Sequence, residues 1–594
     1  MNAAQARRPA AEAARVGAAR AKLVFYLLLF VATCVAGRFF VVQVRDGPML
    51  AHRAYEQHLT TIEFPAHRGS IYDRNGDTLV RSLPSQSVFV RTANVADVAA
   101  TARALAPYLP DKSVPELEEY LRSRHPYVQL EHKVRREQAD AIAKLGLPGI
   151  SIVPEQTGMR FVPSGHLAST VIGFTGFDEN GLDGVEYAFD SLLSGTSGEM
   201  VLEGDQFGRA LPFAQPRVVV APKSGHSLVL TLDSFLQYNA ERILHETIAR
   251  YRAQNGSIVV MDPHTGEVLA LANDPDFDVR DYGRYSVDAL RDRAVTDAYE
   301  PGSTFKLITA AAALESGKVT PDDRFPARDT LQIGGRTIHN AEDGFLAGSS
   351  DTENLEEIIA KSHNVGAAEV GLRIGRATMY DMLQRFGFGT STEIGLPGEN
   401  PGIVPRLADW SETSLPTIAF GHGIATTPLA LARAYCAIAN GGLLLRPRIL
   451  AAILDGDGRT IYRYGPEIER RVISSRTAAI LRRYLRAVVV RGTGHPAAEV
   501  PGYTTAGKTG TAQVAEDGYY AAGKYVASFV GFVPAEAPRF VILVKISEPQ
   551  GAIYGGVVAA PAFARLAKIA MMHAGIVPSD TRLVRAAVSS KHHS

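Results

Sequence analysis

Residues 23–44 form an apolar stretch in which Arg38 is the one charged side chain. As a helix this stretch would be about 33 Å long, which is enough to cross the hydrocarbon core of a bilayer. Arg38 lies toward one end, from where its side chain can reach the membrane surface or a partner. The pattern therefore predicts an uncleaved transmembrane helix over residues 23–44.

The segment before this helix, residues 1–22, is rich in alanine and has one acidic residue, Glu12. Its basic residues are Arg7, Arg8, Arg15, Arg20 and Lys22. Because basic residues stay on the cytoplasmic side of a membrane helix, we predict a disordered cytoplasmic tail over 1–22. The remaining chain is then extracytoplasmic or periplasmic, and the protein is a single-pass protein of the cytoplasmic (inner) membrane.

Two other signals are compatible with an N-terminal apolar segment, a cleaved signal peptide and a lipoprotein signal at Cys34. Apolar residues continue past the small residues at 35–37, where a signal peptide would be cleaved. Thr33, directly before the cysteine, fits a lipoprotein signal poorly. We therefore expect a retained anchor.

Residues 45–220 show a mixed α/β pattern with many turns, which predicts a first extracytoplasmic domain. Asn75-Gly76 follows a short strand pattern and predicts a hairpin, which the residues alone place at the surface. Ser113, with Glu116 three residues later, has the spacing of a helix start. Helical periodicity also appears over 135–144.

A second domain is expected over residues 221–576. Residues 234–252 have the apolar spacing of an amphipathic helix. Two pairs of strand-like segments flank turn residues and predict hairpins, namely 257–261 with 267–272 and 527–533 with 539–546. Hairpins form antiparallel sheets, so the fold class is α+β with helices packed on an antiparallel sheet, after a mixed α/β domain.

Composition narrows the class of protein. The chain has 594 residues, 46% of them hydrophobic, and 62 basic against 62 acidic side chains. This neutral balance gives no basic excess for nucleic-acid binding. The two cysteines, Cys34 and Cys436, are not expected to pair because Cys34 lies in the membrane segment. Residues 577–594 are polar and basic and predict a flexible C-terminal tail.

Candidate chemistry begins at Pro301-Gly302-Ser303, which is followed by a strongly helix-forming run that includes Lys306. Residues three apart on a helix share a face, so the Lys306 amine can reach the Ser303 hydroxyl as its base. The first turn also offers unpaired backbone N–H groups, useful where an oxyanion develops. Ser-x-x-Lys alone is short enough to occur by chance.

Two companion motifs strengthen the signal, Ser362-His363-Asn364 and Lys508-Thr509-Gly510. This trio, in this order, occurs in penicillin-binding proteins and class A β-lactamases. Ser362 and Asn364 are two residues apart and share a side in an extended or loop conformation, with His363 pointing elsewhere. We expect Ser362 to relay a proton to the leaving amine and Asn364 to hold a substrate amide.

Lys306 must be neutral to accept a proton, so its pKa must be well below the usual lysine value. Burial and a second cation, Lys508, would both lower it. Residues 508–512 read as an edge strand along which a substrate backbone can pair, with Gly510 leaving room. Thr509 and Thr511 can bind a terminal carboxylate, and the backbone N–H groups of Ser303 and Thr511 can form an oxyanion hole.

These motifs and their surroundings resemble the class B penicillin-binding proteins over nearly the whole chain. Residues 68–76 and 181–186 are similar to the family's two non-catalytic signatures, and residues 293–297 and 427–435 follow the family around the site. The resemblance implies a penicillin-binding (serine-transpeptidase) fold preceded by a dimerisation-type pedestal domain. Residues 548–563 are most similar to the division-specific, FtsI-type branch.

The resemblance implies a D,D-transpeptidase that cross-links peptidoglycan stem peptides in septal wall synthesis. Ser303 would attack the penultimate D-Ala carbonyl, release D-Ala and pass the acyl group to an amine, and β-lactams would acylate the same serine. A septal glycosyltransferase of the SEDS family and other divisome membrane proteins are the implied partners. No metal or organic cofactor is implied.

Several alternatives stay open at this point. A class A β-lactamase needs a carboxylate for deacylation, and the nearest candidate, Glu393, precedes Pro397 where that family has asparagine. The anchor and the first domain also disfavour a β-lactamase. An elongation-type transpeptidase or a D,D-carboxypeptidase would use the same residues. A division scaffold or β-lactam sensor is the non-enzymatic alternative, which the intact trio disfavours.

Overall fold

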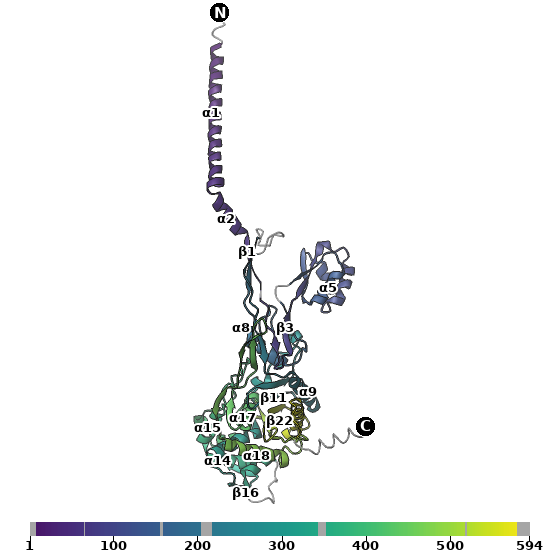
Figure 1. The fold of residues 1–594 in the computed structure, drawn as a ribbon, viewed down its shortest axis with the longest axis vertical. Helices are drawn as coiled ribbons and strands as arrows, with labels where there is room; N and C mark the ends of the chain where they lie inside the picture. The colour runs from purple at the N-terminus through teal and green to yellow at the C-terminus, as the bar shows by residue number, and fades with distance from the viewer. Residues whose placement is uncertain are drawn as a thin grey trace. The chain divides into compact units, whose positions relative to one another are not determined.

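The structure, a computed structural model, describes residues 7–64, 66–154, 158–203, 217–341, 352–516 and 519–578. The chain divides into two compact units, which are described separately (Figure 1). The first takes in the chain up to Ala66 together with Thr196–Lys223. The second takes in His67–Gly195 and the chain from Ser224 onward.

The first unit begins with a long helix. α1 (Arg7–Phe40) continues as a π-helical segment (Val41–Arg45), and the span Arg15–Arg45 is long and apolar enough to cross a membrane. This span contains the predicted membrane segment, residues 23–44. Its side chains are largely exposed, as expected of a surface that contacts lipid instead of a protein core.

The prediction that residues 1–22 are disordered is wrong for the part that the structure describes. α1 begins at Arg7, so residues 7–22 are helical. Alanine has the highest helix propensity, and a helix that is already nucleated needs only to be extended through such residues. The apolar pattern thus marks the membrane span but not the point at which the helix begins.

A three-stranded antiparallel sheet completes the first unit, in the order β1-β8-β9. Helix α2 (Gly47–His58) leads into β1 (Leu59–Phe64). The other two strands come from later in the chain: β8 (Gly198–Glu203) pairs with β1, and β9 (Arg217–Val220) pairs with β8. The chain therefore leaves this unit after β1 and returns to it before entering the enzyme domain.

The hairpin predicted at Asn75-Gly76 is confirmed, but it is not a surface hairpin. Gly76 adopts a φ of +91°, and Ile71 and Asp73 on the hairpin are fully buried. The reason is a six-stranded sheet, β19-β18-β10-β2-β3-β7, in which the hairpin pairs with β10. Its strands are β2 (Ile71–Tyr72), β3 (Thr78–Leu83), β7 (Met159–Phe161), β10 (Ser227–Leu230), β18 (Leu450–Leu454) and β19 (Thr460–Arg463).

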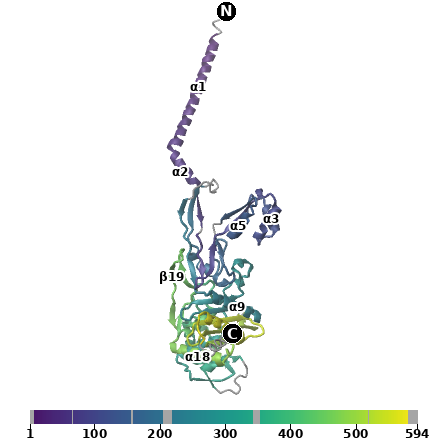
Figure 2. The same cartoon turned by 45° about the vertical axis from the view of Figure 1, so that its right-hand side comes forward.

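A small lobe with its own apolar core forms another part of the second unit. Its sheet has the order β5-β4-β6, with β4 (Gln86–Arg91), β5 (Tyr127–Val134) and β6 (Ile150–Pro154). Figures 1 and 2 show α5 and α3 on this lobe. Its helices are α3 (Val98–Leu105), α4 (Val114–Leu121) and α5 (Arg136–Lys144), which confirm the helices predicted near 113 and 135. The Ser113–Glu116 capping box is present at α4.

The predicted second domain, residues 221–576, is built on a five-stranded antiparallel sheet in the order β12-β11-β23-β22-β21. Both predicted hairpins are confirmed, since β11 pairs with β12 and β22 pairs with β23. The strands are β11 (Asn255–Met261), β12 (Val268–Asp274), β21 (Ala506–Glu516), β22 (Tyr519–Val533) and β23 (Phe540–Ser547). The predicted α+β class is therefore correct.

Helices cover both faces of this sheet. On one face, α9 (Ser234–Tyr251) and α20 (Ala560–His573) pack against alternate residues such as Ile258 and Val260. On the other face, the intervening residues of β11 join a core with helices from the middle of the chain. These helices are α12 (Lys306–Glu315), α13 (Leu355–Lys361), α14 (Asn364–Ile374), α15 (Arg376–Arg385), α17 (Pro428–Ala439) and α18 (Ser475–Arg491). α9 confirms the helix predicted over 234–252.

Short elements connect these layers. The short helices are η2 (Thr92–Asn94), η3 (Ala106–Tyr108), α6 (Ser169–Ile172), α7 (Gly184–Ala188), α8 (Asp190–Leu193), η4 (Val279–Arg284), α10 (Val287–Leu290), α11 (Arg293–Thr296), η5 (Gly302–Phe305), η6 (Leu407–Asp409), α16 (Ser414–Ile418) and α19 (Gly555–Val558). The short strands are β13 (Arg324–Pro326), β14 (Thr330–Ile333), β15 (Arg336–His339), β16 (Thr352–Asn354), β17 (Leu443–Leu445) and β20 (Ile468–Arg471).

The two non-catalytic signatures meet in a buried ion network around Glu186. One carboxylate oxygen of Glu186 accepts a hydrogen bond from Arg68 at 2.8 Å, and the other accepts one from Arg160 at 2.6 Å. Arg68 also pairs with Asp190 at 2.6 Å. Glu186, Arg68 and Arg160 are nearly inaccessible to water. Removal of the Glu186 charge would therefore leave both guanidinium groups without their buried counter-charge, and Arg68 would keep Asp190, a partly exposed carboxylate.

Glu186→Gln is therefore expected to destabilise the second unit by about 3 kcal/mol, the order measured when one partner of a buried ion pair is removed. The measurement is the thermal unfolding midpoint by circular dichroism. Glu118→Gln is the matched control, because Glu118 pairs with Arg122 within one exposed helix and should change stability by less than about 0.5 kcal/mol. Equal effects of the two substitutions would contradict the role assigned to Glu186.

Candidate active site

Ser303 lies in the 3-10 turn η5, and Lys306 begins α12 directly after it. The Lys306 Nζ atom is 3.0 Å from the Ser303 Oγ atom, as the three-residue spacing predicts. Gly302 makes this turn possible, because its φ of +55° lies in the left-handed region. The hydroxyl of Ser303 remains partly exposed while the amine beneath it is fully buried.

The second motif lies on the other side of the Lys306 amine. Lys306 Nζ donates to Asn364 Oδ1 at 2.8 Å and to Ser362 Oγ at 3.2 Å, and it also contacts the Ser362 carbonyl. Ser362 has a left-handed backbone, with a φ of +67°, in the turn between α13 and α14. This turn confirms the expected loop conformation that places Ser362 and Asn364 on one side.

The pKa of Lys306 is held well below its usual value. Burial of the ammonium group is the largest cause, and the nearby charge of Lys508 adds to it. Both causes are those that the sequence suggested. A neutral Lys306 amine has a free electron pair, so it is able to accept the proton of the Ser303 hydroxyl.

His363 points away from this cluster, as predicted. It is buried, and its Nδ1 atom contacts the Glu353 carboxylate. Sequence reasoning missed Glu353 and also Asn340, whose side-chain oxygen accepts the backbone N–H groups of Asn364 at 2.9 Å and Val365 at 3.1 Å. Asn340 thereby satisfies two N–H groups at the start of α14, and no motif near it in the sequence signals this role.

The third motif lies on β21, which is the edge strand of the five-stranded sheet, as predicted. Lys508 is fully buried, and burial lowers its pKa to about 7. Its Nζ atom lies 3.3 Å from the Thr509 hydroxyl, which in turn lies 2.6 Å from the Thr493 hydroxyl. The Thr511 hydroxyl accepts the N–H of Gly555 at 3.2 Å. Thr493 and Gly555 were not identified from the sequence.

Gly510 lets β21 approach the turn that holds Ser303. A Cβ atom at this position would lie 2.3 Å from Ser528 Oγ, 2.9 Å from Thr304 Cγ2 and 3.1 Å from the Pro301 carbonyl. Any larger residue would therefore push the strand and the turn apart. The structure thus brings all three motifs together around Lys306, Lys508 and the edge strand.

A rim of further polar residues borders Ser303. The Glu300 carboxylate accepts the N–H of Gly423 at 2.8 Å and lies 3.2 Å from the Tyr520 hydroxyl. His422 Nδ1 is 3.0 Å from that hydroxyl, and burial, together with the charge of Lys306, lowers the pKa of His422 to about 4. Sequence reasoning did not identify this rim, although Glu300 directly precedes the Pro-Gly-Ser turn.

The asparagine of the second motif is fully engaged within the protein. Its Oδ1 atom accepts from Lys306, and its Nδ2 atom donates to the His339 carbonyl at 2.9 Å. Among the described residues, no group of three or more His, Cys, Asp or Glu side chains has an arrangement that could hold a metal ion. The groups that the structure places around Ser303 are two lysines, the hydroxyl groups of Ser362, Thr509 and Thr511, and the Asn364 side chain.

Two regions of the chain match known domain families. Residues 63–230 match the penicillin-binding protein dimerisation domain, and residues 256–568 match the penicillin-binding protein transpeptidase domain. Together they span most of the chain, in the predicted order. The exact limits predicted for the two domains, 45–220 and 221–576, stay predictions.

Relatives of similar length agree with these matches. The chain is 33% identical to stage V sporulation protein D of Bacillus subtilis, over 95% of this chain and 87% of that protein. It is 33% identical to peptidoglycan D,D-transpeptidase FtsI of Escherichia coli, over 90% of this chain and 88% of that protein. Both similarities cover at least nine-tenths of this chain.

Solved structures give the same result. Penicillin-binding protein 3 of Mycobacterium tuberculosis, in complex with aztreonam, matches with a TM-score of 0.68 and 32% identity, over 87% of this chain and 98% of that chain. Penicillin-binding protein 2X of Streptococcus thermophilus matches with a TM-score of 0.72 and 25% identity, over 86% of this chain and 80% of that chain. With both domains, their order and the three motifs in place, the chain belongs to the class B penicillin-binding proteins and is a peptidoglycan D,D-transpeptidase.

Proposed function

We propose that this transpeptidase works through an acyl-enzyme on Ser303, with Lys306 as the base that activates it. The observation that carries the proposal is the 3.0 Å distance between the Ser303 hydroxyl and the buried Lys306 amine. Burial and the charge of Lys508 lower the pKa of Lys306, which favours the neutral amine that this role requires.

In the first half of the reaction, Ser303 Oγ attacks the carbonyl of the penultimate D-Ala as its proton passes to Lys306 Nζ. The negative charge that develops on the carbonyl oxygen is stabilised by the backbone N–H groups of Ser303 and Thr511. Ser362, at 3.2 Å from Lys306 Nζ, relays the proton to the nitrogen of the departing D-Ala. The peptide C–N bond breaks, and the donor remains bound as an ester.

In the second half, an amine of a neighbouring stem peptide attacks the ester carbonyl. The same groups act in reverse, so Lys306 accepts a proton of the amine and returns it to Ser303 Oγ as the ester bond breaks. Asn364 holds Lys306 in place through its side-chain oxygen in the absence of substrate. We propose that it also binds a substrate amide once the stem peptide displaces its bond to His339.

The edge strand provides the recognition of the donor. An extended stem peptide would pair along the free edge of β21, which Gly510 allows to lie close to the turn that holds Ser303. Its terminal carboxylate would be bound by the hydroxyl groups of Thr509 and Thr511, with the Lys508 charge behind them. β-Lactams carry a carboxylate and an acylating carbonyl, so they would occupy the same positions and acylate Ser303.

Product analysis tests this function against the D,D-carboxypeptidase alternative. The full-length protein in detergent is incubated with a stem pentapeptide that ends in D-Ala-D-Ala and carries a free side-chain amine, and the products are identified by mass spectrometry. We expect a cross-linked dimer together with released D-Ala. Release of D-Ala with a shortened monomer as the sole peptide product would instead support hydrolysis.

We further propose a role in septal wall synthesis, with the enzyme domain outside the cytoplasmic membrane and the N-terminus inside. The similarity of residues 548–563 to the division-specific branch and the apolar N-terminal helix support this role. A SEDS-family glycosyltransferase and other divisome membrane proteins are the expected partners. A fluorescent fusion is expected at the division site, and uniform labelling of the cell periphery would contradict the septal role.

A further inference from the structure

One register row of the enzyme-domain sheet is formed by small and polar residues instead of large apolar ones. Strand pairing places its five members side by side across all five strands. From the edge strand inward they are Gly510, Ser528, Lys545, Ser257 and Asn273. The row therefore joins the proposed substrate-binding edge at Gly510 to the central strand β23, where it contains a buried lysine.

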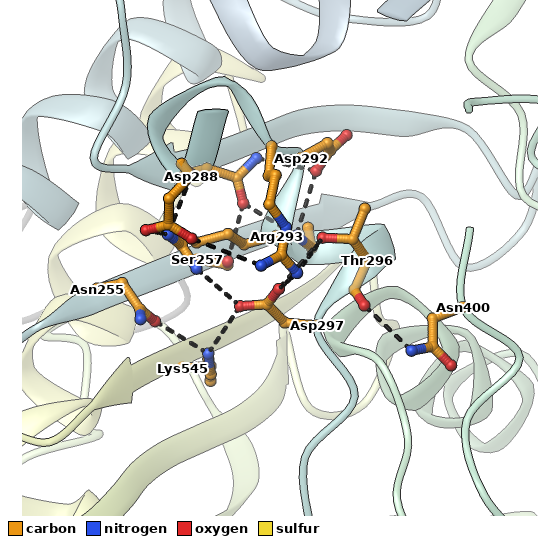
Figure 3. Close-up of polar contacts among 12 residues, drawn as sticks. Asn255, Ser257, Asp288, Asp292, Arg293, Thr296, Asp297, Asn400 and Lys545 are labelled. Atoms are coloured by element: carbon orange, nitrogen blue, oxygen red, sulfur yellow. Dashed lines mark hydrogen bonds and ion pairs between the residues drawn. The ribbon is translucent and has the colours of Figure 1, made fainter. Parts of the chain in front are cut away.

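Lys545 belongs to a polar network that also contains Asn255, Asp297 and Arg293 (Figure 3). Its Nζ atom lies between the side chains of Asn255, at 3.2 Å, and Asp297, at 3.8 Å. The same atom is 5.9 Å from the centre of the Tyr299 ring, which adds a cation–π contact. The side chain of Lys545 is 4% exposed, so these contacts replace water around the charge.

Asp297 and Tyr299 belong to the segment that runs from α11 to Ser303. Arg293 holds Asp297 from the other side at 3.1 Å, so Asp297 lies between the guanidinium group and the lysine. The backbone of Tyr299 exchanges two hydrogen bonds with Thr426, at 3.1 and 2.9 Å. Lys545 thus contacts two residues of the segment that leads to the nucleophile.

On its other side, Lys545 lies next to Ser528 in the register row. Ser528 Oγ occupies the space beside Gly510, within 2.3 Å of where a Cβ atom would lie. The buried lysine therefore contacts the segment that leads to Ser303, and its register neighbour Ser528 lies on the strand that pairs with β21, which carries Lys508 and Thr511. The distance between these two parts determines whether the nucleophile and the oxyanion hole meet the same carbonyl.

Stability does not explain a lysine at this position. Burial opposes its charge, and two arginines of the network, Arg293 and Arg291, add repulsion that Asp297 offsets in part. Replacing a whole buried ion pair by apolar residues is often neutral or stabilising, and without Lys545 the Asp297 carboxylate would still have Arg293 and Arg291 as cationic partners. A buried charge that is not needed for stability, and that contacts the segment leading to Ser303, has a use in the geometry of the site.

We propose that Lys545 is a positioning residue, which sets the spacing between the Ser303 segment and the edge strand β21 through Asp297, Tyr299 and Ser528. The proposal rests on the function assigned above to Ser303. Lys545 itself does not contact the substrate. Its effect is on how fast a bound donor acylates the serine, and not on how tightly the protein folds.

Lys545→Met tests this inference, because methionine keeps the unbranched stem and removes the charge. The acylation rate constant at saturating fluorescent penicillin is expected to fall by about tenfold to a hundredfold, the range caused by small misplacements of reacting groups. The rate is expressed per labelled site, so that misfolded protein does not count. The thermal unfolding midpoint is expected to stay equal to that of the wild type or to rise.

Two further variants give the controls. Ser257→Ala removes the neighbour of Lys545 in the same row, on the side away from β21, and is expected to acylate at the wild-type rate. Asp297→Asn and the double variant Asp297→Asn/Lys545→Met complete a double-mutant cycle. The loss of acylation rate in the double variant is expected to be smaller than the two single losses combined, because both substitutions break the same contact. Additive effects would overturn the path through Asp297.

The pH dependence of the acylation rate distinguishes the effect of Lys545 from that of the other lysines. Burial lowers the pKa of Lys545 to about 8, with Asp297 raising it and Arg293 and Arg291 lowering it. Its remaining polar neighbours are Asn255, Ser257, Tyr299 and Ser528. The ratio of wild-type to Lys545→Met rates cancels the titration of the groups that both proteins share, and it should fall toward one as the pH rises above about 8.

The acylation rate and the unfolding midpoint of Lys545→Met together test the positioning role. A wild-type acylation rate in Lys545→Met, with or without a lower unfolding midpoint, would overturn this role. A slower rate with an unchanged midpoint and a ratio that narrows above pH 8 would support it. If Ser303→Ala were still labelled in the same assay, the proposed function would fail first, and that result is separate from any result at Lys545.

Discussion

Replacing Ser303 with alanine is expected to abolish covalent labelling by a fluorescent penicillin. The hydroxyl that forms the ester is removed, while the 3-10 turn, the edge strand and both lysines stay in place. In the wild type, mass spectrometry of the digested protein is expected to find the acyl group on the peptide that contains Ser303. The loss in Ser303→Ala is expected to be complete and not partial, because no other group at the site forms the ester.

Ser316→Ala is the matched control for this substitution. Ser316 follows the same helix, α12, and its hydroxyl donates to the Ala313 carbonyl at 3.2 Å, away from the motifs. Labelling at the wild-type level is expected there. An adduct that persists in Ser303→Ala, or one found on a different peptide of the wild type, would remove the nucleophile from the mechanism. A persistent adduct on Ser303 would also separate the protein from a β-lactamase, which would hydrolyse it.

Lys306→Met is expected to slow acylation by about 10²–10⁴-fold, the usual contribution of a general base. The substitution removes the amine that lies 3.0 Å from Ser303 Oγ and keeps an unbranched side chain of similar length in the buried site. The measurement is the second-order rate of labelling under conditions in which the wild type is complete within minutes. Lys568→Met, at an exposed position on α20, is the control and is expected to be labelled normally.

The acylation rate of the wild type is expected to depend on pH through the protonation of Lys306 and Lys508. The pKa of Lys306 is far below that of an ordinary lysine, so acylation should rise with pH as Lys306 loses its proton. Burial places the pKa of Lys508 at about 7, so the binding of a carboxylate should weaken as Lys508 becomes neutral at higher pH. The two lysines interact, so the limbs of the resulting bell belong to the pair.

A penicillin methyl ester separates the two limbs. It lacks the carboxylate, so the alkaline limb is expected to disappear while the acid limb stays. Lys306→Met is expected to lose the acid limb, because its remaining activity no longer needs a neutral lysine at that position. A flat profile in the wild type with the ordinary penicillin would show that neither lysine titrates in the working range, and it would contradict the assigned base.

Local sequence patterns were sufficient for much of the fold. The apolar spacing over 234–252 predicted α9, and the turn residues between apolar segments predicted both hairpins of the enzyme-domain sheet. These features depend on interactions between near neighbours in the chain, which periodicity and turn propensity describe directly. The same patterns gave a wrong prediction at residues 7–22, which are helical although they precede the apolar span predicted to cross the membrane.

The candidate site was predictable where local secondary structure alone sets the distance between the residues of a motif. Ser303 and Lys306 are one helical turn apart, so their spacing in sequence is nearly their spacing in space. The loop conformation that places Ser362 and Asn364 on one side, with His363 pointing away from them, also followed from a local pattern, whereas the left-handed backbone of Ser362 came from the structure. Glu353, Asn340 and Thr493 could not be found in this way, because each is brought to the motifs by a distant part of the chain.

By itself, the sequence predicted an apolar span long enough to cross a membrane, the α+β class, the three motifs and Lys306 as the proposed base of Ser303. Only the tertiary structure decided that the first signature is buried around Glu186 and that Lys545 lies between the nucleophile segment and the edge strand. The physical reason is the same in both cases. A buried charge is tolerated only when groups from remote segments surround it, and strand register and domain packing, which no short pattern encodes, decide which groups those are.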